Sequence, residues 1–176
     1  SKEDILYAKR MNMAIRLLAT SRKAEDGRVF SMVSPFMVNS SSPLYNVNGV
    51  FNAVFIHGDM LGDSMYYGSG AGKLPTASAV VGDVVLCARN KGKTVMTFNS
   101  NEKLSLADIA EDSRRFLIRI PKEELDEAVI NFGNCEIIRI EELSGEVGIV
   151  TGVLTEKEFE ERSKKIGSII NRIRIK

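Results

Sequence analysis

The chain has 176 residues and a mass of 19.4 kDa, with 24 basic and 23 acidic residues and a formal net charge of +1. Its content of 44% hydrophobic and 27% charged residues is typical of a globular protein that buries its own core. The balanced charge gives no reason to expect nucleic acid or an anionic membrane as a partner, and no apolar run approaches the roughly 20 residues of a membrane span.

The N-terminal part is predicted to form a helix followed by two strands. Ser1 is followed three residues later by the acid Asp4, which is the capping-box pattern of a helix start. Pro35 marks an edge position or a bulge in the second strand, because proline has no N–H for a sheet ladder. The predicted elements are a helix over about 2–13, a strand over 14–21 and an extended segment over 28–38.

A hairpin is predicted after the serine-rich loop at 39–43. Two extended runs, 50–56 and 63–67, flank a turn that contains two Gly-Asp steps. The turn carries His57, the single histidine of the chain. No serine, cysteine or carboxylate constellation surrounds it in the sequence, so we interpret His57 as a solvated turn residue and predict no catalytic residue.

A glycine-rich loop precedes the most distinctive helix pattern, in the stretch 66–89 (YYGSGAGKLPTASAVVGDVVLCAR). Glycine adopts backbone angles that a Cβ forbids and lets a ligand approach the main chain. Pro75 suits the first turn of a helix, and Thr76 or Ser78 could supply oxygens to the opening amides. The pattern predicts N–H groups presented to an anion or polar cofactor, although glycines that merely turn the chain would produce the same pattern.

The C-terminal part follows a polar connector at 94–112, for which one helical turn is expected. Pro121 opens the first of its helices, and Thr155 with Glu158 repeats the capping-box pattern at the second. We interpret the acidic residues of both helices as solvated surface, and predict no metal ligands. The elements are a strand over 115–120, a helix over 122–131, strands over 135–140 and 147–154, a helix from 155 to about 166, and a strand over 169–175.

This order, β-α-β-β-α-β, is the split βαβ pattern of ferredoxin-like domains. The two cysteines, Cys87 and Cys135, lack a paired spacing, so we expect reduced core residues and a cytoplasmic protein.

Three segments of the chain resemble a known family, the homoserine dehydrogenases, and the first of them is the predicted helix and strand at 3–8 and 15–19. The run from Asn52 through the glycine loop to PTASAVV and Asp83 resembles the late part of homoserine dehydrogenases, and it is a long and specific match. The segment from Arg115 resembles the ACT domain that many bacterial members carry. The fold class expected is α+β: a mixed sheet with packed helices, followed by a ferredoxin-like βαββαβ ACT-type domain. The expected domains are 1–93 (C-terminal part of the catalytic domain), 94–113 (connector) and 114–176 (ACT-like).

The resemblance implies a C-terminal part of an NAD(P)-dependent enzyme that interconverts aspartate 4-semialdehyde and homoserine. The Rossmann half and the catalytic lysines of the family have no counterpart here, so the chain alone is expected to be inactive and to hold no cofactor tightly. By the same resemblance, Gly72 approaches the nicotinamide cofactor, with Gly70 and Ala71 beside it. The implied partner is a nucleotide-binding domain in cis, and a homodimer is expected separately because sheet edges in both halves of the chain invite pairing.

Two alternative functions depend on the ACT-like part alone. The first is an amino-acid-sensing regulatory module, and the second is a structural scaffold for dimerisation. The turn at 120–124 (IPKEE) has no glycine and places two acids where a family member would meet the carboxylate of an amino-acid effector. This departure favours a structural module over feedback by threonine.

Overall fold

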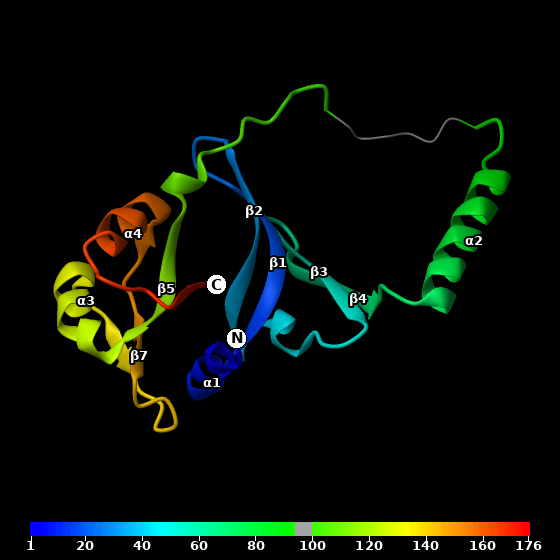
Figure 1. The fold of residues 1–176 in the computed structure, drawn as a ribbon. Helices are drawn as coiled ribbons and strands as arrows, with labels where there is room; N and C mark the ends of the chain where they lie inside the picture. The colour runs from blue at the N-terminus through cyan, green and yellow to red at the C-terminus, as the bar shows by residue number, and fades with distance from the viewer. Residues whose placement is uncertain (94–99) are drawn as a thin grey trace. The chain divides into compact units, whose positions relative to one another are not determined.

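The computed structural model describes residues 1–93 and 100–176 and divides into two compact units (Figure 1). The first, here called the sheet unit, comprises residues 1–45 and 104–176; the second, the hairpin–helix unit, comprises 46–103. Part of the predicted connector, 94–99, lies outside the described residues. The units differ from the division expected at 93 and 114, because strands from the first 45 residues join the C-terminal strands in one sheet.

The sheet unit contains the predicted elements with small shifts in their bounds. Both predicted capping boxes are confirmed: Ser1 accepts from the Asp4 amide, and Thr155 accepts from the Glu158 amide. The predicted strand over 147–154 is instead two short strands, β7 and β8, separated by residues 151–153. The elements are α1 (Lys2–Arg10), β1 (Met13–Lys23), β2 (Val29–Asn39), η1 (Pro43–Asn46), η2 (Ile109–Glu111), β5 (Ser113–Pro121), η3 (Lys122–Glu124), α3 (Leu125–Phe132), β6 (Glu136–Ile138), β7 (Glu146–Val150), β8 (Leu154–Thr155), α4 (Glu156–Ser163) and β9 (Asn171–Ile175).

One mixed sheet runs through this unit in the order β1-β2-β9-β5-β7-β6, with β8 paired to β5. The four strands β9-β5-β7-β6 are antiparallel neighbours, and the connections after β5 and β7 contain α3 and α4, as the predicted βαββαβ pattern requires. β2 joins them through a parallel pairing of only two residue pairs, Phe36 with Arg174 and Met37 with Ile175. The expected mixed α+β fold is therefore observed.

Alternation along β5 divides the core into two layers. Because successive side chains of a strand point to opposite faces, Phe116, Ile118 and Ile120 pack on the face covered by α3 and α4, whereas Leu117 packs on the face covered by α1 (Figure 1). The first layer also contains Phe132 of α3 and Phe159 of α4. The second is completed by residues of α1, β1, β2, β6, β7 and β9: Tyr7, Ala8, Met13, Met37, Ile138, Val150 and Ile173.

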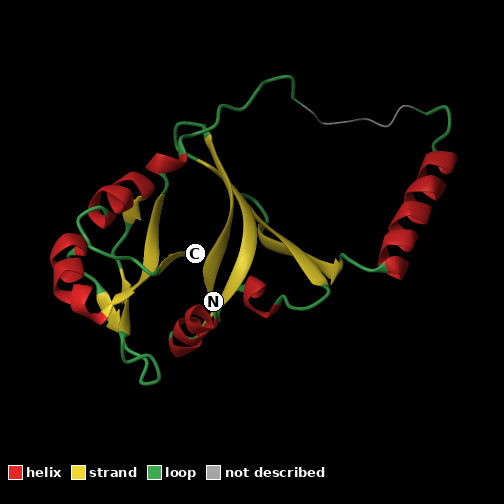
Figure 2. Ribbon diagram, viewed as in Figure 1, coloured by secondary structure: helices red, strands yellow, loops and turns green. Residues whose placement is uncertain are grey.

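The hairpin–helix unit consists of β3 (Phe51–Gly58), β4 (Gly62–Ser69) and α2 (Lys73–Arg89) (Figure 2). The predicted hairpin is confirmed, with β3 and β4 antiparallel and Phe51 paired opposite Ser69. No residue of α2 is buried. The prediction that Cys87 is a core residue is therefore wrong, since it lies exposed on this helix, whereas Cys135 is half-buried against the α3–α4 core layer. Across the described ranges, no helix is both long and apolar enough to cross a membrane.

Candidate functional site

The glycine loop is placed between the end of β4 and the start of α2. Gly72 is the N-cap residue of α2, and its φ of 114° with ψ of 156° is a conformation that only glycine adopts without strain. Gly70 is required for a different reason: a Cβ there would lie 1.8 Å from Nδ2 and 2.7 Å from Cγ of Asn52. The residues predicted to bind the cofactor, Gly70, Ala71 and Gly72, are thus consecutive and exposed.

The start of α2 is uncapped by side chains. The helix begins at Lys73, two residues before Pro75, and no side chain accepts a hydrogen bond from its opening amides. The prediction that Thr76 or Ser78 caps the helix is therefore wrong; the Thr76 amide instead donates to the Gly72 carbonyl at 3.1 Å. Its first turn contains no acidic residue. The unsatisfied amides and the helix dipole give this loop the electrostatic character of a site for an anion or a polar amide.

His57 pairs with Asp63 across the hairpin, with 2.6 Å between Nδ1 and Oδ1. Its side chain is 77% exposed, which agrees with the interpretation of a solvated residue. Within the residues that the structure describes, no group of three His, Cys, Asp or Glu side chains could hold a metal ion.

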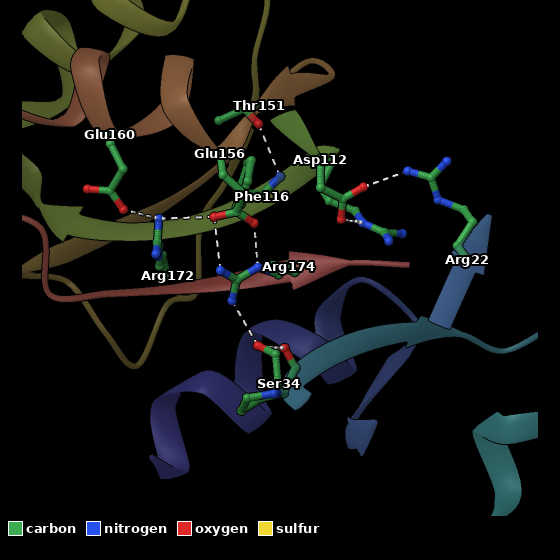
Figure 3. A network of polar contacts seen from close by, with 11 residues as sticks. Arg22, Ser34, Asp112, Phe116, Thr151, Glu156, Glu160, Arg172 and Arg174 are labelled. Carbon is green, nitrogen blue, oxygen red and sulfur yellow. Dashed lines mark hydrogen bonds and ion pairs between the residues drawn. The ribbon is translucent and has the colours of Figure 1, made fainter. Parts of the chain in front are cut away.

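A buried polar network in the sheet unit was not predicted from the sequence (Figure 3). The carboxylate of Glu156, 5% exposed at the first position of α4, accepts from Nε of Arg174 at 2.5 Å and from its Nη2 at 2.9 Å. Arg174 also donates through Nη1 to the Ser34 hydroxyl of β2 at 2.8 Å. Arg172 forms an ion pair with Glu160 at 2.7 Å. The network therefore connects α4, β9 and β2 beside the short parallel pairing.

A second buried cluster surrounds Arg119 of β5, which is 4% exposed. Its Nη1 donates to Asp4 Oδ1 at 2.7 Å, and its Nε and Nη2 donate to the two carboxylate oxygens of Glu146 at 2.9 and 2.7 Å. Asp4 also accepts from the Ser1 amino group and from Asn171. The cluster ties α1 to β5, β7 and β9. One sequence signal was available for both clusters, namely arginines inside otherwise apolar strands (RFLIRI and INRIRI).

The cluster at Asp4 predicts a dependence of stability on pH. Burial alone would raise the pKa of Asp4, but hydrogen bonds from the Ser1 amino group and from Arg119 outweigh it and lower the pKa from 3.8 to about 2. Because the folded pKa is lowered, the stabilisation is present above pH 3.8 and is lost as the pH falls towards about 2. We expect the free energy of unfolding to fall by about 2 kcal/mol from this group over that window.

Urea unfolding at several pH values from 7 to 2 measures this contribution. Asp4→Asn is expected to reduce the fall in the free energy of unfolding below pH 3.8. Asp59→Asn, at the exposed hairpin tip, should leave the dependence of that free energy on pH unchanged. A curve for Asp4→Asn that stays as steep as that of the parent chain would contradict the assignment.

The comparisons with known proteins place the segment that holds the glycine loop in a class of oxidoreductases, the dehydrogenases. The family model for homoserine dehydrogenase matches residues 1–85. The chain is 48% identical over 86 residues to the homoserine dehydrogenase of Neisseria gonorrhoeae, and 38% identical over 130 residues to that of Corynebacterium glutamicum. Residues 1–85 of this chain belong to the homoserine dehydrogenase family.

These alignments cover 49% and 70% of this chain but only 20% and 29% of the respective relatives. Among solved structures, a homoserine dehydrogenase from Thiobacillus denitrificans superposes with a TM-score of 0.80 at 26% identity, covering 100% of this chain and 45% of that one. A Staphylococcus aureus homoserine dehydrogenase has the same fold, with a TM-score of 0.72 at 20% identity. The chain thus spans less than half the length of these relatives.

Proposed function

We propose that this chain is the C-terminal part of a homoserine dehydrogenase, which interconverts aspartate 4-semialdehyde and homoserine with NAD(P). The observation that carries the proposal is the glycine loop at the uncapped start of α2, which lies inside the segment that matches the family. The names of the relatives support the reaction, and their greater length supports the idea that further chain is needed for it.

In this proposal, the main chain of Gly70, Ala71 and Gly72 forms one wall of the nicotinamide site. NAD(P) supplies the hydride chemistry when it is bound, and the loop positions the ring and excludes water from it. The structure is compatible with this role, because a Cβ at Gly72 would meet only the ring of Pro75, at 3.6 Å, so the space in front of the backbone is open.

The remaining walls would come from a nucleotide-binding domain in cis, and a second copy of the chain would complete a homodimer. The hairpin–helix unit supports the need for partners, because it exposes more apolar side chains than the surface of a monomeric protein normally does. They include Phe51, Val54 and Ile56 on β3, Tyr66 and Tyr67 on β4, and Val80, Val81, Val84, Val85 and Leu86 on α2. A cytoplasmic location remains part of the proposal.

The ACT-like part is proposed to act as a structural module. Its turn between β5 and α3 has no glycine, and the carboxylate of Glu124 accepts a hydrogen bond from the Gly167 amide at 3.1 Å. A Cβ at Gly167 would lie 2.5 Å from that carboxylate, so the two segments are closely packed. An amino-acid effector would have to displace this contact and meet a negative charge. Calorimetric titration with threonine, lysine, methionine and isoleucine tests the alternative, and saturable binding of any one would favour the sensing module.

The oxidoreductase function is tested by complementation. The chain alone is expected to show no NAD(P)+-dependent oxidation of homoserine, and activity is expected once the N-terminal part of a homoserine dehydrogenase is fused or co-expressed upstream. Turnover by the chain alone would contradict the need for a missing half. A folded, complemented protein without activity would contradict the reaction itself, and light scattering on the same sample tests the dimer.

The cofactor role of the loop predicts a specific effect of Gly72→Ala in the complemented enzyme. A Cβ on a residue with a φ of 114° is strained, so the backbone of the loop is displaced. We expect the KM for NAD(P)H to rise about tenfold, because the main chain of the loop no longer lies in its position against the nicotinamide ring. Gly82→Ala, in the middle of the same helix with nothing within 4 Å of its Cβ, is the matched control and should leave KM unchanged. Equal KM values for both variants would remove Gly72 from the site.

A further inference from the structure

A pocket of about 440 Å³ lies in the sheet unit, on the face covered by α1. It is bordered by the C-terminal end of α1, by β6, and by the ends of β1, β2 and β9. Its apolar lining continues the buried core layer beneath α1: Met13 and Ile138 are each 8% exposed. A volume of this size fits a small organic molecule.

The rim of this pocket is positively charged. Three arginines, Arg10, Arg115 and Arg139, line it together with a single acidic residue, Glu136. These arginines come from α1, β5 and the end of β6, so the fold gathers them from three separate segments.

The arginines of this pocket differ from the others of the sheet unit in their partners. Elsewhere in the unit, guanidinium groups either pair with carboxylates, as at Arg119 and Arg174, or donate to backbone carbonyls, as at Arg162. Among the described residues, the side chains of Arg10 and Arg139 make neither a hydrogen bond nor an ion pair, and the Arg115 side chain donates only through Nε, to the Thr151 carbonyl at 3.2 Å. The pocket therefore retains donors in the forked geometry that binds carboxylate and phosphate oxygens.

We infer that this pocket binds a small organic anion that carries at least two negative charges on an aliphatic skeleton. The charged groups would meet the arginines, and the carbon chain would lie on the apolar floor of Met13, Ile138 and Ile175. A carboxylate and a phosphate share the chemistry that the guanidinium groups recognise. The excess of cations disfavours a zwitterion with no net charge, such as a neutral amino acid.

Calorimetry on the 176-residue chain with glutarate, inorganic pyrophosphate and leucine tests the inference. Saturable 1:1 binding of glutarate or pyrophosphate is expected, weakening as salt rises. If glutarate binds more tightly, the ligand class is an aliphatic dicarboxylate. If pyrophosphate binds more tightly, it is a phosphorylated compound. No saturable binding of either anion to the folded chain in the millimolar range, or leucine binding as tightly as glutarate, would overturn the inference.

Variants locate the binding in this pocket. Arg10→Gln and Arg139→Gln each remove an exposed, unpaired side chain, so folding should be preserved, and each should weaken binding about tenfold. Glu136→Gln should tighten binding severalfold, because it removes the one like charge on the rim. Lys9→Gln, a loss of the same charge one residue outside the pocket lining, should change affinity less than about twofold. If Lys9→Gln weakened anion binding as much as Arg10→Gln, the binding would reflect unspecific electrostatic attraction to a basic surface, which would contradict a site in this pocket.

Discussion

Replacing Arg119 by methionine is expected to lower the free energy of unfolding by about 3–5 kcal/mol, the largest effect of any single substitution considered. The side chain is 4% exposed and makes ion pairs at 2.7 Å with both Asp4 and Glu146. Methionine retains much of the volume but removes the cation of Glu146 and leaves Asp4 with only the partly exposed Ser1 amino group as a cation, while both carboxylates stay largely buried. Burying an unpaired charge costs more than the ion pair itself contributes.

Denaturant unfolding at neutral pH measures this change, and Arg139→Met is its matched control. Arg139 is exposed and unpaired among the described residues, so its loss should change stability by less than about 0.5 kcal/mol. Combining Arg119→Met with Glu146→Gln and Asp4→Asn should recover part of the loss, because no buried charge then remains unpaired. A loss below about 1 kcal/mol for Arg119→Met alone would mean that the cluster is hydrated in solution.

Glu156→Leu is expected to cost about 2–3 kcal/mol and to weaken one particular junction in the sheet. The estimate is lower than for Arg119 because Arg174 is 18% exposed and can regain water. Loss of the carboxylate releases Arg174 from α4, and Arg174 is one of only two β9 residues paired with β2. Hydrogen exchange of the Lys176 amide, which donates to the Met37 carbonyl at 3.0 Å, should therefore accelerate.

Glu160→Leu is the control for this substitution. Glu160 lies on the same helix and pairs with Arg172, but its side chain is 55% exposed, so we expect a change within about 1 kcal/mol and no faster exchange at Lys176. If Glu156→Leu destabilised the protein without affecting that amide, the network would stabilise α4 but not the junction between β2 and β9.

Elements whose signals are local were predicted well. The hairpin at 51–69 follows from two extended runs around Gly-Asp steps, and both capping boxes require only residues three apart in the chain. The start of α2 was misplaced by two residues, because Pro75 is tolerated at the third helical position as well as the first. Gly72 is the N-cap, so Thr76 is the fourth and Ser78 the sixth residue of the helix, and neither stands at the position from which a side chain caps the opening amides.

The candidate cofactor site depends on the same local signals. Gly70, Ala71 and Gly72 are neighbours in the sequence, and they lie between β4 and α2, the strand and helix that the loop pattern predicted on either side of them. What could not be predicted is why Gly70 must be glycine, since Asn52 approaches it across the hairpin from 18 positions earlier in the chain. The anion pocket was missed for the same reason, because its arginines come from positions 10, 115 and 139.

The sequence alone determined the order of the elements, the βαββαβ pattern and the glycine loop of the homoserine dehydrogenase family, because periodicity, capping and turn chemistry act over a few residues. Only the tertiary structure decided that β2 pairs with β9, and that Arg119 and Glu156 are buried among charged partners. The pairing of Phe36 with Arg174 and the contact of Arg119 with Asp4 join segments more than 100 residues apart, and even Glu156 and Arg174 are 18 positions apart, so no local pattern encodes these contacts.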